Sequence, residues 1–195
     1  MQAVLRRLRC ERGLTLLELM LAMVLMGVLV MAMTGLLTTV THWGDKVQED
    51  ATLQAEARAA LDHFAHDLRQ AYTGDGTPAI ETMSATQLTF LSPDRSTPFR
   101  LRRISYRLNG GALERADALS TNAGAPPWTF PALSPYTAQV GSIVNSTVFT
   151  YQTATGTTAT TPAAVVRVTV TLVLSSGRQN ATNQFQISTT LRQST

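Results

Sequence analysis

The sequence has a single cysteine, Cys10, and no proline before Pro78. One cysteine cannot close an intrachain disulfide, so the folded part of the chain must be held together by its own core. Cys10 also precedes the apolar stretch that begins at Leu14, where it could not become the lipidated residue of a lipoprotein. The lack of early prolines permits one uninterrupted helix as far as Pro78.

The N-terminal region has the length and charge of a membrane anchor. Residues 14–37 are almost entirely apolar, and these 24 residues would form a helix of about 36 Å, enough to cross a hydrocarbon core of about 30 Å. The leader before them carries four arginines against one glutamate, namely Arg6, Arg7, Arg9 and Arg12 against Glu11. Because basic flanks stay in the cytoplasm, we predict that everything after Leu37 lies outside.

Two secretion signals offer alternative interpretations of this region. A cleavable secretory signal is disfavoured because the apolar run exceeds the usual length of about 7 to 15 residues, contains Glu18, and is not promptly followed by an Ala-x-Ala-like site. Arg6-Arg7 could begin a twin-arginine signal, but the supporting residues are missing. A retained anchor is therefore the favoured interpretation.

Glu18 is the one ionisable side chain within residues 14–37. An ionised carboxylate at membrane depth is costly and normally marks a functional contact, so Glu18 requires a positive partner. The alternative is that Glu18, one turn inside the membrane edge, extends to the inner headgroups.

The residues around Glu18 form a specific signal. The run Arg12-Gly13-Leu14-Thr15-Leu16-Leu17-Glu18-Leu19-Met20 resembles the type III signal of type IV pilins and type II secretion pseudopilins. In that family a prepilin peptidase cuts after the glycine and methylates the new amino terminus. The resemblance implies cleavage between Gly13 and Leu14 and N-methylation of Leu14. Leu14 itself departs from the family, which most often has phenylalanine at this position.

The resemblance also implies a role for Glu18, which would attract the Leu14 amine of a neighbouring subunit and set the register of the filament. The implied partners are the prepilin peptidase, other pilin or pseudopilin subunits and an inner-membrane assembly platform. The implied location is the inner membrane, with a cytoplasmic N-terminus and a periplasmic head, and the filament after assembly. Many pilins have a proline within the anchor, where this chain has Gly35.

Removal of the leader changes the charge of the chain. The 16 basic and 13 acidic residues become 12 of each when four arginines and Glu11 leave with residues 1–13. The excess positive charge therefore serves membrane topology and does not indicate binding to nucleic acid.

An amphipathic helix is predicted to continue the anchor through residues 38–73. Apolar side chains recur three or four residues apart and form one stripe, Leu53, Ala57, Leu61, Phe64, Leu68 and Tyr72, as on one face of a helix. The glycines and the proline of residues 74–78 supply a stop, so we expect the helix to end near Thr73.

Beyond Gly76 the apolar period changes to two, which predicts strands. The candidate strands are residues 87–91, 99–108, 112–115, 143–151, 165–174 and 183–192, with a tight turn at Asn109-Gly110-Gly111 and another around Gly177. Residues 116–139 contain four prolines and no steady period, and we expect an irregular excursion whose Trp128, Phe130 and Tyr136 return to the core.

These elements predict an α+β fold. A long N-terminal helix, transmembrane in its first half, would pack on an antiparallel head sheet of five or six strands, the pilin-like lollipop. The expected organisation is a leader at 1–13, a transmembrane and filament-core helix at 14–37, its amphipathic continuation at 38–73 and a β-rich head at 74–195. The head has a looser resemblance, without a diagnostic motif, to minor pseudopilins of the GspJ kind and to PilW-like minor pilins.

We predict no catalytic site, metal site or cofactor. His63 and His66, beside Asp62 and Asp67, have a spacing compatible with a metal, but such residues more often form the solvated edge of an amphipathic helix. Asp75 lies between two glycines and is expected to serve a turn. The many serines and threonines accompany no nucleophile motif.

An arginine-rich segment provides the main competing interpretation. Five arginines lie close together with only Asp94 opposing them, namely Arg95, Arg100, Arg102, Arg103 and Arg107. Arginines interleaved with Phe99 and Tyr106 could bind phosphates and stack bases in DNA. They could also form a charged outer sheet face or contact the next subunit, which we favour because strand alternation divides them between two faces and no nucleic-acid fold motif accompanies them.

The sequence therefore predicts a minor pilin or pseudopilin, a structural subunit of a type IV pilus or type II secretion filament. The alternatives are a DNA-binding minor pilin of natural transformation and a membrane-anchored extracytoplasmic domain of another activity. The sequence does not distinguish secretion, pilus motility and DNA uptake.

Overall fold

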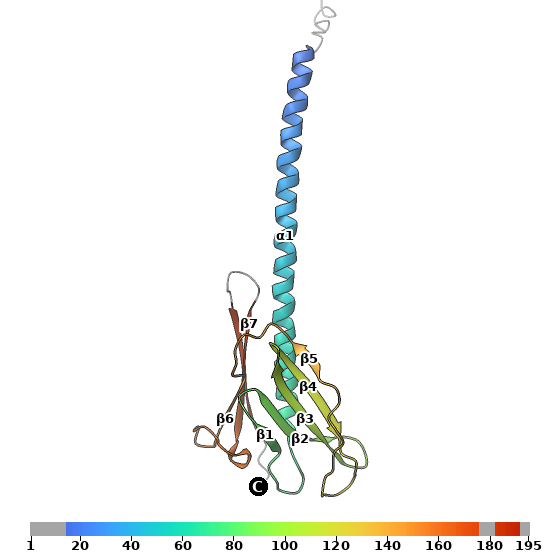
Figure 1. The fold of residues 1–195 in the computed structure, drawn as a ribbon, viewed down its shortest axis with the longest axis vertical. Helices are drawn as coiled ribbons and strands as arrows, with labels where there is room; N and C mark the ends of the chain where they lie inside the picture. The colour runs from blue at the N-terminus through green and yellow to red at the C-terminus, as the bar shows by residue number, and fades with distance from the viewer. Residues whose placement is uncertain (1–14, 176–181, 192–195) are drawn as a thin grey trace, which may run out of the picture. The chain divides into compact units, whose positions relative to one another are not determined.

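The fold was obtained as a computed structural model that describes residues 15–175 and 182–191. The described chain contains the long helix α1 (Leu16–Arg69), eight strands and the short 3-10 helix η1 (Pro162–Ala164) (Figure 1). Contacts divide the chain into two compact units, Met1–Gln48 and Glu49–Thr195. The predicted α+β class is confirmed.

The first unit contains a helical segment suited to a membrane. Leu16–Thr41 spans 26 residues with a mean hydropathy of 2.5, and none of it is buried against the rest of the described chain. At about 1.5 Å per residue this segment is longer than a hydrocarbon core of about 30 Å. It is the one helix in the described part of the chain that is long and apolar enough to cross a membrane.

The threonines of this segment satisfy their hydroxyl groups within the helix. Thr34 donates to the carbonyl of Val30 at 3.1 Å, and Thr38 donates to that of Thr34 at 3.1 Å. Thr39 and Thr41 make the same kind of bond to carbonyls one turn earlier. A hydroxyl bonded in this way requires no partner from lipid, since its own helix supplies the acceptor.

In the second unit, α1 buries the stripe that the sequence predicts. Ala57, Leu61, Phe64 and Leu68 are all at most 5% exposed. Tyr72 departs from the prediction, because it lies outside the helix and is 39% exposed.

The helix ends at Arg69, earlier than the expected end near Thr73. Gln70 and Ala71 donate their backbone N–H groups three residues back, to Asp67 and Leu68. The Tyr72 N–H instead donates to Leu91 O at 3.0 Å. The chain therefore leaves the helix to join a strand before it reaches Gly74.

The strands form two sheets instead of the single sheet expected. The five-stranded sheet A follows chain order and contains β1 (Ile80–Met83), β2 (Gln87–Asp94), β3 (Arg100–Asn109), β4 (Ala112–Leu119) and β5 (Thr137–Val140). The three-stranded sheet B contains β6 (Phe149–Gln152), β7 (Arg167–Ser175) and β8 (Thr182–Thr190). All pairings are antiparallel.

Sheet B begins separately because β6 is held beside the β1–β2 turn. The backbone N–H groups of Val148 and Phe149 both donate to Ala85 O, at 2.8 and 3.0 Å. The Tyr151 hydroxyl donates to Ser84 O at 2.7 Å. Because these bonds place β6 beside the β1–β2 turn, β6 does not extend sheet A beyond β5 and instead begins sheet B.

Phe64 joins both sheets to α1. Its ring is T-shaped to that of Tyr106 in β3, with centroids 5.1 Å apart, and is tilted against that of Phe149 in β6, with centroids 5.9 Å apart. Phe64, Tyr106 and Phe149 are each no more than 1% exposed. One core therefore serves the helix and both sheets of this unit.

The β3–β4 hairpin forms as predicted. Asn109 pairs with Ala112, and both intervening residues, Gly110 and Gly111, have positive φ, at 55° and 77°. Two consecutive positive φ angles are required by a type I′ turn and strongly favour glycine.

The predicted strand at 143–151 is wrong in its first half. Only Phe149–Gln152 forms a strand there, while Ile143 makes an isolated bridge to Leu174. The side chain of Asn145 accepts from Val173 N at 2.8 Å and donates to Thr171 O at 2.9 Å. This amide therefore takes bonds that a paired strand would have made.

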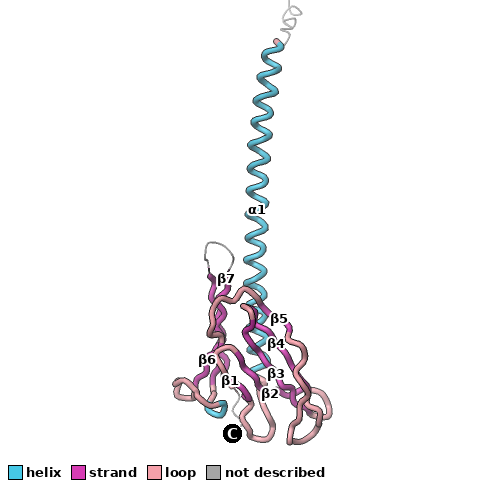
Figure 2. Tube along the Cα trace, viewed as in Figure 1, coloured by secondary structure: helices cyan, strands magenta, loops and turns pink. Residues whose placement is uncertain are grey.

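The irregular excursion is shorter than the predicted 116–139. Strand β4 continues to Leu119 and β5 forms at Thr137–Val140, so the irregular part is 120–136, drawn as loop in Figure 2. The alternation continues after Arg115, where buried Ala116 and Ala118 flank the charged Asp117. The predicted turn at Gly177 and the end of the 183–192 strand at Arg192 lie outside the described residues.

The packing of Phe64 against both sheets predicts that truncating its side chain strongly lowers the stability of the head. Phe64→Ala should lower the free energy of unfolding by about 3–5 kcal/mol, because it opens a cavity facing both sheets. Unfolding of the detergent-solubilised full chain in urea, followed by the near-ultraviolet signal of the head, measures this. His63→Ala, on the exposed side of the same helical turn, is the control and should cost at most about 0.5 kcal/mol; equal effects would contradict the assignment of Phe64.

Candidate functional site

Glu18 lies in the first turn of α1, where its carboxylate faces the start of the helix. Thr15 donates to Glu18 Oε2 from its backbone N and from its Oγ1, both at 3.4 Å. In return Glu18 N donates to Thr15 Oγ1 at 3.3 Å. This reciprocal pattern is a capping box with Thr15 before the helix and Glu18 at its third position.

The capping box was not recognised in the sequence, although its Thr-x-x-Glu signature is present at residues 15–18. In an apolar stretch the charge of Glu18 is more conspicuous than its spacing to Thr15. A negative charge in the first turn also suits the positive end of the helix dipole. The sequence signal is therefore sufficient to place the Glu18 carboxylate at the N-terminal end.

Glu18 has no basic partner within the described residues. Its capping bonds use Oε2, and no described contact involves Oε1. The other polar side chains of Leu16–Thr41 are threonines bonded to their own helix. In this segment Glu18 is thus the group that still needs a cation from outside. Gly13 and Leu14, the predicted cleavage and methylation positions, lie outside the described residues.

Residues 8–34 match the prokaryotic N-terminal methylation motif. The chain carries the N-terminal signal of a type IV pilin-like or pseudopilin-like precursor. Such a prepilin signal implies processing by a prepilin peptidase and assembly with other pilin-like subunits at a membrane. No curated protein matches the chain at a significant level.

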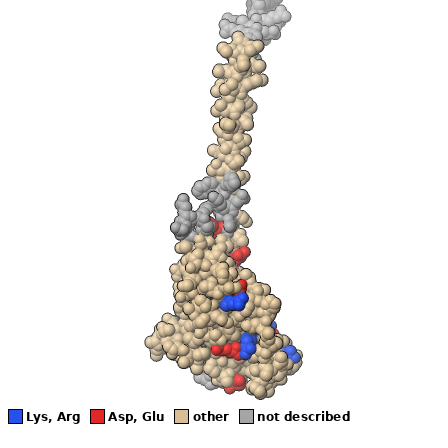
Figure 3. Space-filling view, viewed as in Figure 1, with Lys and Arg blue, Asp and Glu red and all other residues tan. Residues whose placement is uncertain are grey.

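On the head of this precursor, three of the predicted arginines are paired with carboxylates. Arg103 makes a two-pronged contact with Glu81, Nε to Oε2 at 2.7 Å and Nη2 to Oε1 at 2.8 Å. Arg102 Nη2 donates to Asp94 Oδ1 and Arg107 Nε to Glu114 Oε2, both at 2.7 Å. Figure 3 shows acidic and basic side chains next to one another on the head.

Strand register explains these pairs. Arg102 lies opposite Ser92 on β2, near Asp94, and Arg107 lies opposite Glu114 on β4. The arginines that look uncompensated along the chain therefore meet acids from neighbouring strands. The Arg107 guanidinium donates to Glu114 and lowers the pKa of that carboxyl. Arg95 and Arg100 form no ion pair within the described residues.

Phe130 and Tyr136 of the excursion cover these arginines, and Trp128 packs against Phe99 with ring centroids 5.7 Å apart. This corrects the prediction that the three aromatic residues return to the core. The guanidinium carbon of Arg103 lies 4.3 Å from the centroid of Phe130, and that of Arg107 lies 3.6 Å from Tyr136. The hydroxyl groups of Tyr136 and Ser105 are 3.0 Å apart. These rings stay on the polar outer face of sheet A because each lies over a guanidinium, to which its ring is attracted.

A largely buried ion pair ties α1 to sheet A. Arg115 Nε donates to Asp67 Oδ2 at 3.1 Å, with both side chains about 14% exposed or less. The Tyr106 hydroxyl donates to the same oxygen at 2.9 Å. Burial and then the charge of Asp67 raise the pKa of Tyr106, which therefore stays a neutral donor. This pairing corrects the expectation that Asp67 lies on the solvated edge of the helix, because Asp67 faces Arg115 of sheet A.

The other candidate ligands are not brought together. His66 Nε2 is 2.6 Å from Gln70 Nε2, and Asp67 is occupied by Arg115. Asp75 accepts from the Thr77 hydroxyl and from the Thr77 backbone N–H, at 2.6 and 3.0 Å. These bonds lower the pKa of Asp75 and make it a turn residue, as predicted. Among the described residues, no group of three or more His, Cys, Asp or Glu could hold a metal ion.

The ion pairs predict a contrast between two arginines. Arg115→Ala should cost about 3 kcal/mol of unfolding free energy, because it leaves the Asp67 carboxylate buried without its cation. Arg102→Ala is the control, since its pair with Asp94 is more exposed and should cost at most about 1 kcal/mol. Urea unfolding of both variants measures the difference. A larger loss for Arg102→Ala would refute this ranking.

Proposed function

We propose that this chain is a minor pilin or pseudopilin, a non-enzymatic structural subunit of a type IV pilus or type II secretion filament. The observation that carries the proposal is Glu18, a carboxylate held at the N-terminal end of an exposed apolar helix with no cation partner among the described residues. The matched methylation motif around it supports the same conclusion. The subunit would be anchored in the inner membrane with its head in the periplasm.

The proposed mechanism uses the geometry of the first turn. Cleavage after Gly13 would create an amine on Leu14, directly before the capping residue Thr15. A helix of a neighbouring subunit would bring its own amine to the free oxygen of Glu18. Such a charge-assisted contact is strong at low dielectric and has a defined geometry, so it would set the register between subunits. The capping bonds would hold the carboxylate ready for this contact.

Processing is the first test of the proposal. In a host with a prepilin peptidase, the membrane-bound chain should begin at N-methylated Leu14, as shown by intact mass and terminal sequencing. In a host without the peptidase it should keep residues 1–13. A chain that retains Met1 in both hosts, or is cut well beyond Leu37, would exclude a prepilin.

Variants of Glu18 separate charge pairing from helix capping. Glu18→Gln keeps a side chain that can cap the helix but removes the charge, whereas Glu18→Ala removes both. Both should be processed normally and should lower the amount recovered in sheared filaments by at least about tenfold, since a hydrogen bond to a charged group contributes about 1.5–3 kcal/mol. Normal assembly of Glu18→Gln would show that capping alone matters and would reject the pairing mechanism.

DNA binding has less support from the structure. Arg102, Arg103 and Arg107 already have carboxylate partners, and a paired guanidinium contributes little net charge toward phosphate. Of the five arginines in this segment, Arg95 and Arg100 are without an ion pair among the described residues. We therefore propose contact with other subunits as the use of the head surface.

A further inference from the structure

Two strands of the head have open edges. The other two terminal strands are covered. Strand β1 lies beside η1, and on the outer edge of β6 the Tyr151 carbonyl accepts a hydrogen bond from Ala159 N at 3.0 Å. Strands β5 and β8 are the remaining terminal strands of their sheets. No backbone hydrogen bond to the outer edge of either strand occurs within the described residues.

The edge of β8 lacks the usual protection against pairing. Its nine residues, Thr182–Thr190, include no charged residue, proline or glycine, and its register with β7 has no bulge. Natural edge strands are normally shielded by charges, prolines, bulges or short length. A long, regular and uncharged edge is therefore a template for another strand.

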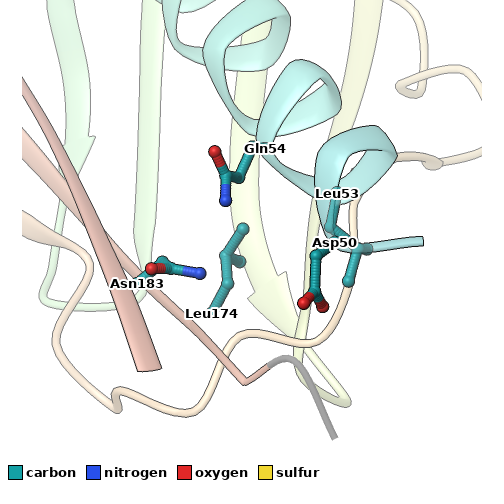
Figure 4. A pocket seen from close by; sticks show the side chains of 5 residues that line it. All are labelled: Asp50, Leu53, Gln54, Leu174 and Asn183. Carbon is teal, nitrogen blue, oxygen red and sulfur yellow. The ribbon is translucent and has the colours of Figure 1, made fainter. Parts of the chain in front are cut away.

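The direction of β8 follows from its neighbours in the head. Asn183 and Leu174 line a small pocket with Asp50, Leu53 and Gln54 of α1 (Figure 4). Farther along β8, Ile187 pairs with Val170, which pairs with Phe149 beside Phe64 of α1. From Asn183 to Ile187 the strand thus passes from the level of Asp50 to that of Phe64. Strand β8 runs in the same direction as the helix.

Strand β5 runs in the opposite direction. Thr137 pairs with Arg115, whose guanidinium contacts Asp67 of α1. Two residues later, Gln139 borders an open groove of about 300 Å³ together with earlier helical residues, Glu56, Ala59, Ala60 and His63. From Thr137 to Gln139 the strand therefore moves toward lower helix numbers.

We propose that β8 of one copy of this chain adds to the open edge of β5 of a second copy. This inference rests on the proposed function in one respect, that a filament holds its α1 helices parallel. Parallel helices make β8 of one copy antiparallel to β5 of the next, the pairing that extends an antiparallel sheet. Two β8 strands would instead run parallel to each other, which does not continue either sheet.

The pairing has two consequences that suit a filament. It joins different surfaces of the two copies, so it is a head-to-tail interface that can continue from subunit to subunit without closing. It is also small, because β5 has only four residues. A contact of this size forms only when the anchors hold the copies close together and raise their effective concentration.

The experiment uses full-length protein in membranes of a host with a prepilin peptidase, with Cys10→Ser in every copy. One tagged copy carries Gln186→Cys on β8 and a differently tagged copy carries Ala138→Cys on β5, both exposed positions. A short bismaleimide should give a yield of linked dimer at least about tenfold higher than for a control pair. The reason is that the two cysteines reach a high effective concentration only when β8 of one copy is paired with β5 of the other. The control pair is Thr150→Cys, on the outer face of β6, with Ala138→Cys.

Each outcome decides the proposal. A single copy carrying both Gln186→Cys and Ala138→Cys should give a ladder of multimers, which head-to-tail pairing requires. The proposal would be overturned if the test pair and the control pair were linked equally. It would also be overturned if copies carrying Gln186→Cys were linked to each other as strongly as to copies carrying Ala138→Cys. The same samples report whether the chain begins at Leu14 and enters sheared filaments. Normal processing and assembly without the specific link refutes only the strand pairing, whereas the link without processing refutes only the proposed function.

Discussion

The head depends on one constraint, the burial of an apolar stripe of α1 against both sheets. Phe64 contacts β3 on one side and β6 on the other, and no disulfide is available to replace that contact because the one cysteine is Cys10. Sheets A and B have separate hydrogen-bond ladders. Their relative position is consequently set by side-chain packing on the helix and by the few bonds at the β1–β2 turn.

Charge is arranged differently in the two units. In the head, arginines meet carboxylates from neighbouring strands, and the buried pair of Arg115 and Asp67 ties the sheet to the helix. In Leu16–Thr41, threonine hydroxyls are bonded within the helix and Glu18 has no cation. Among the described residues, four arginines of the head are paired with carboxylates, whereas the carboxylate of Glu18 in the anchor is not paired with a cation. In the proposed function, the driving interaction of assembly would therefore lie at the helix start.

The capping box would allow Glu18 to combine helix capping with the proposed contact to a neighbouring amine. Oε2 stabilises the first turn of the helix, while the other oxygen is available to an incoming amine. The proposed strand pairing would add a contact at the level of the heads, where β5 and β8 flank α1. Assembly would then combine a strong, register-setting contact at the helix start with a weak, repeated contact at the head.

The sequence by itself determined the features that are local in the chain. Residues 12–20 indicated the prepilin signal, the spacing of three or four residues between Ala57, Leu61, Phe64 and Leu68 indicated the buried helical stripe, and Gly110-Gly111 indicated the hairpin, because spacing and backbone preference act over a few residues. Tertiary structure alone decided what joins distant residues. It paired Arg103 with Glu81 and Arg115 with Asp67, divided the strands into two sheets, and set the directions of β5 and β8 along α1, since these depend on which strands become neighbours in space.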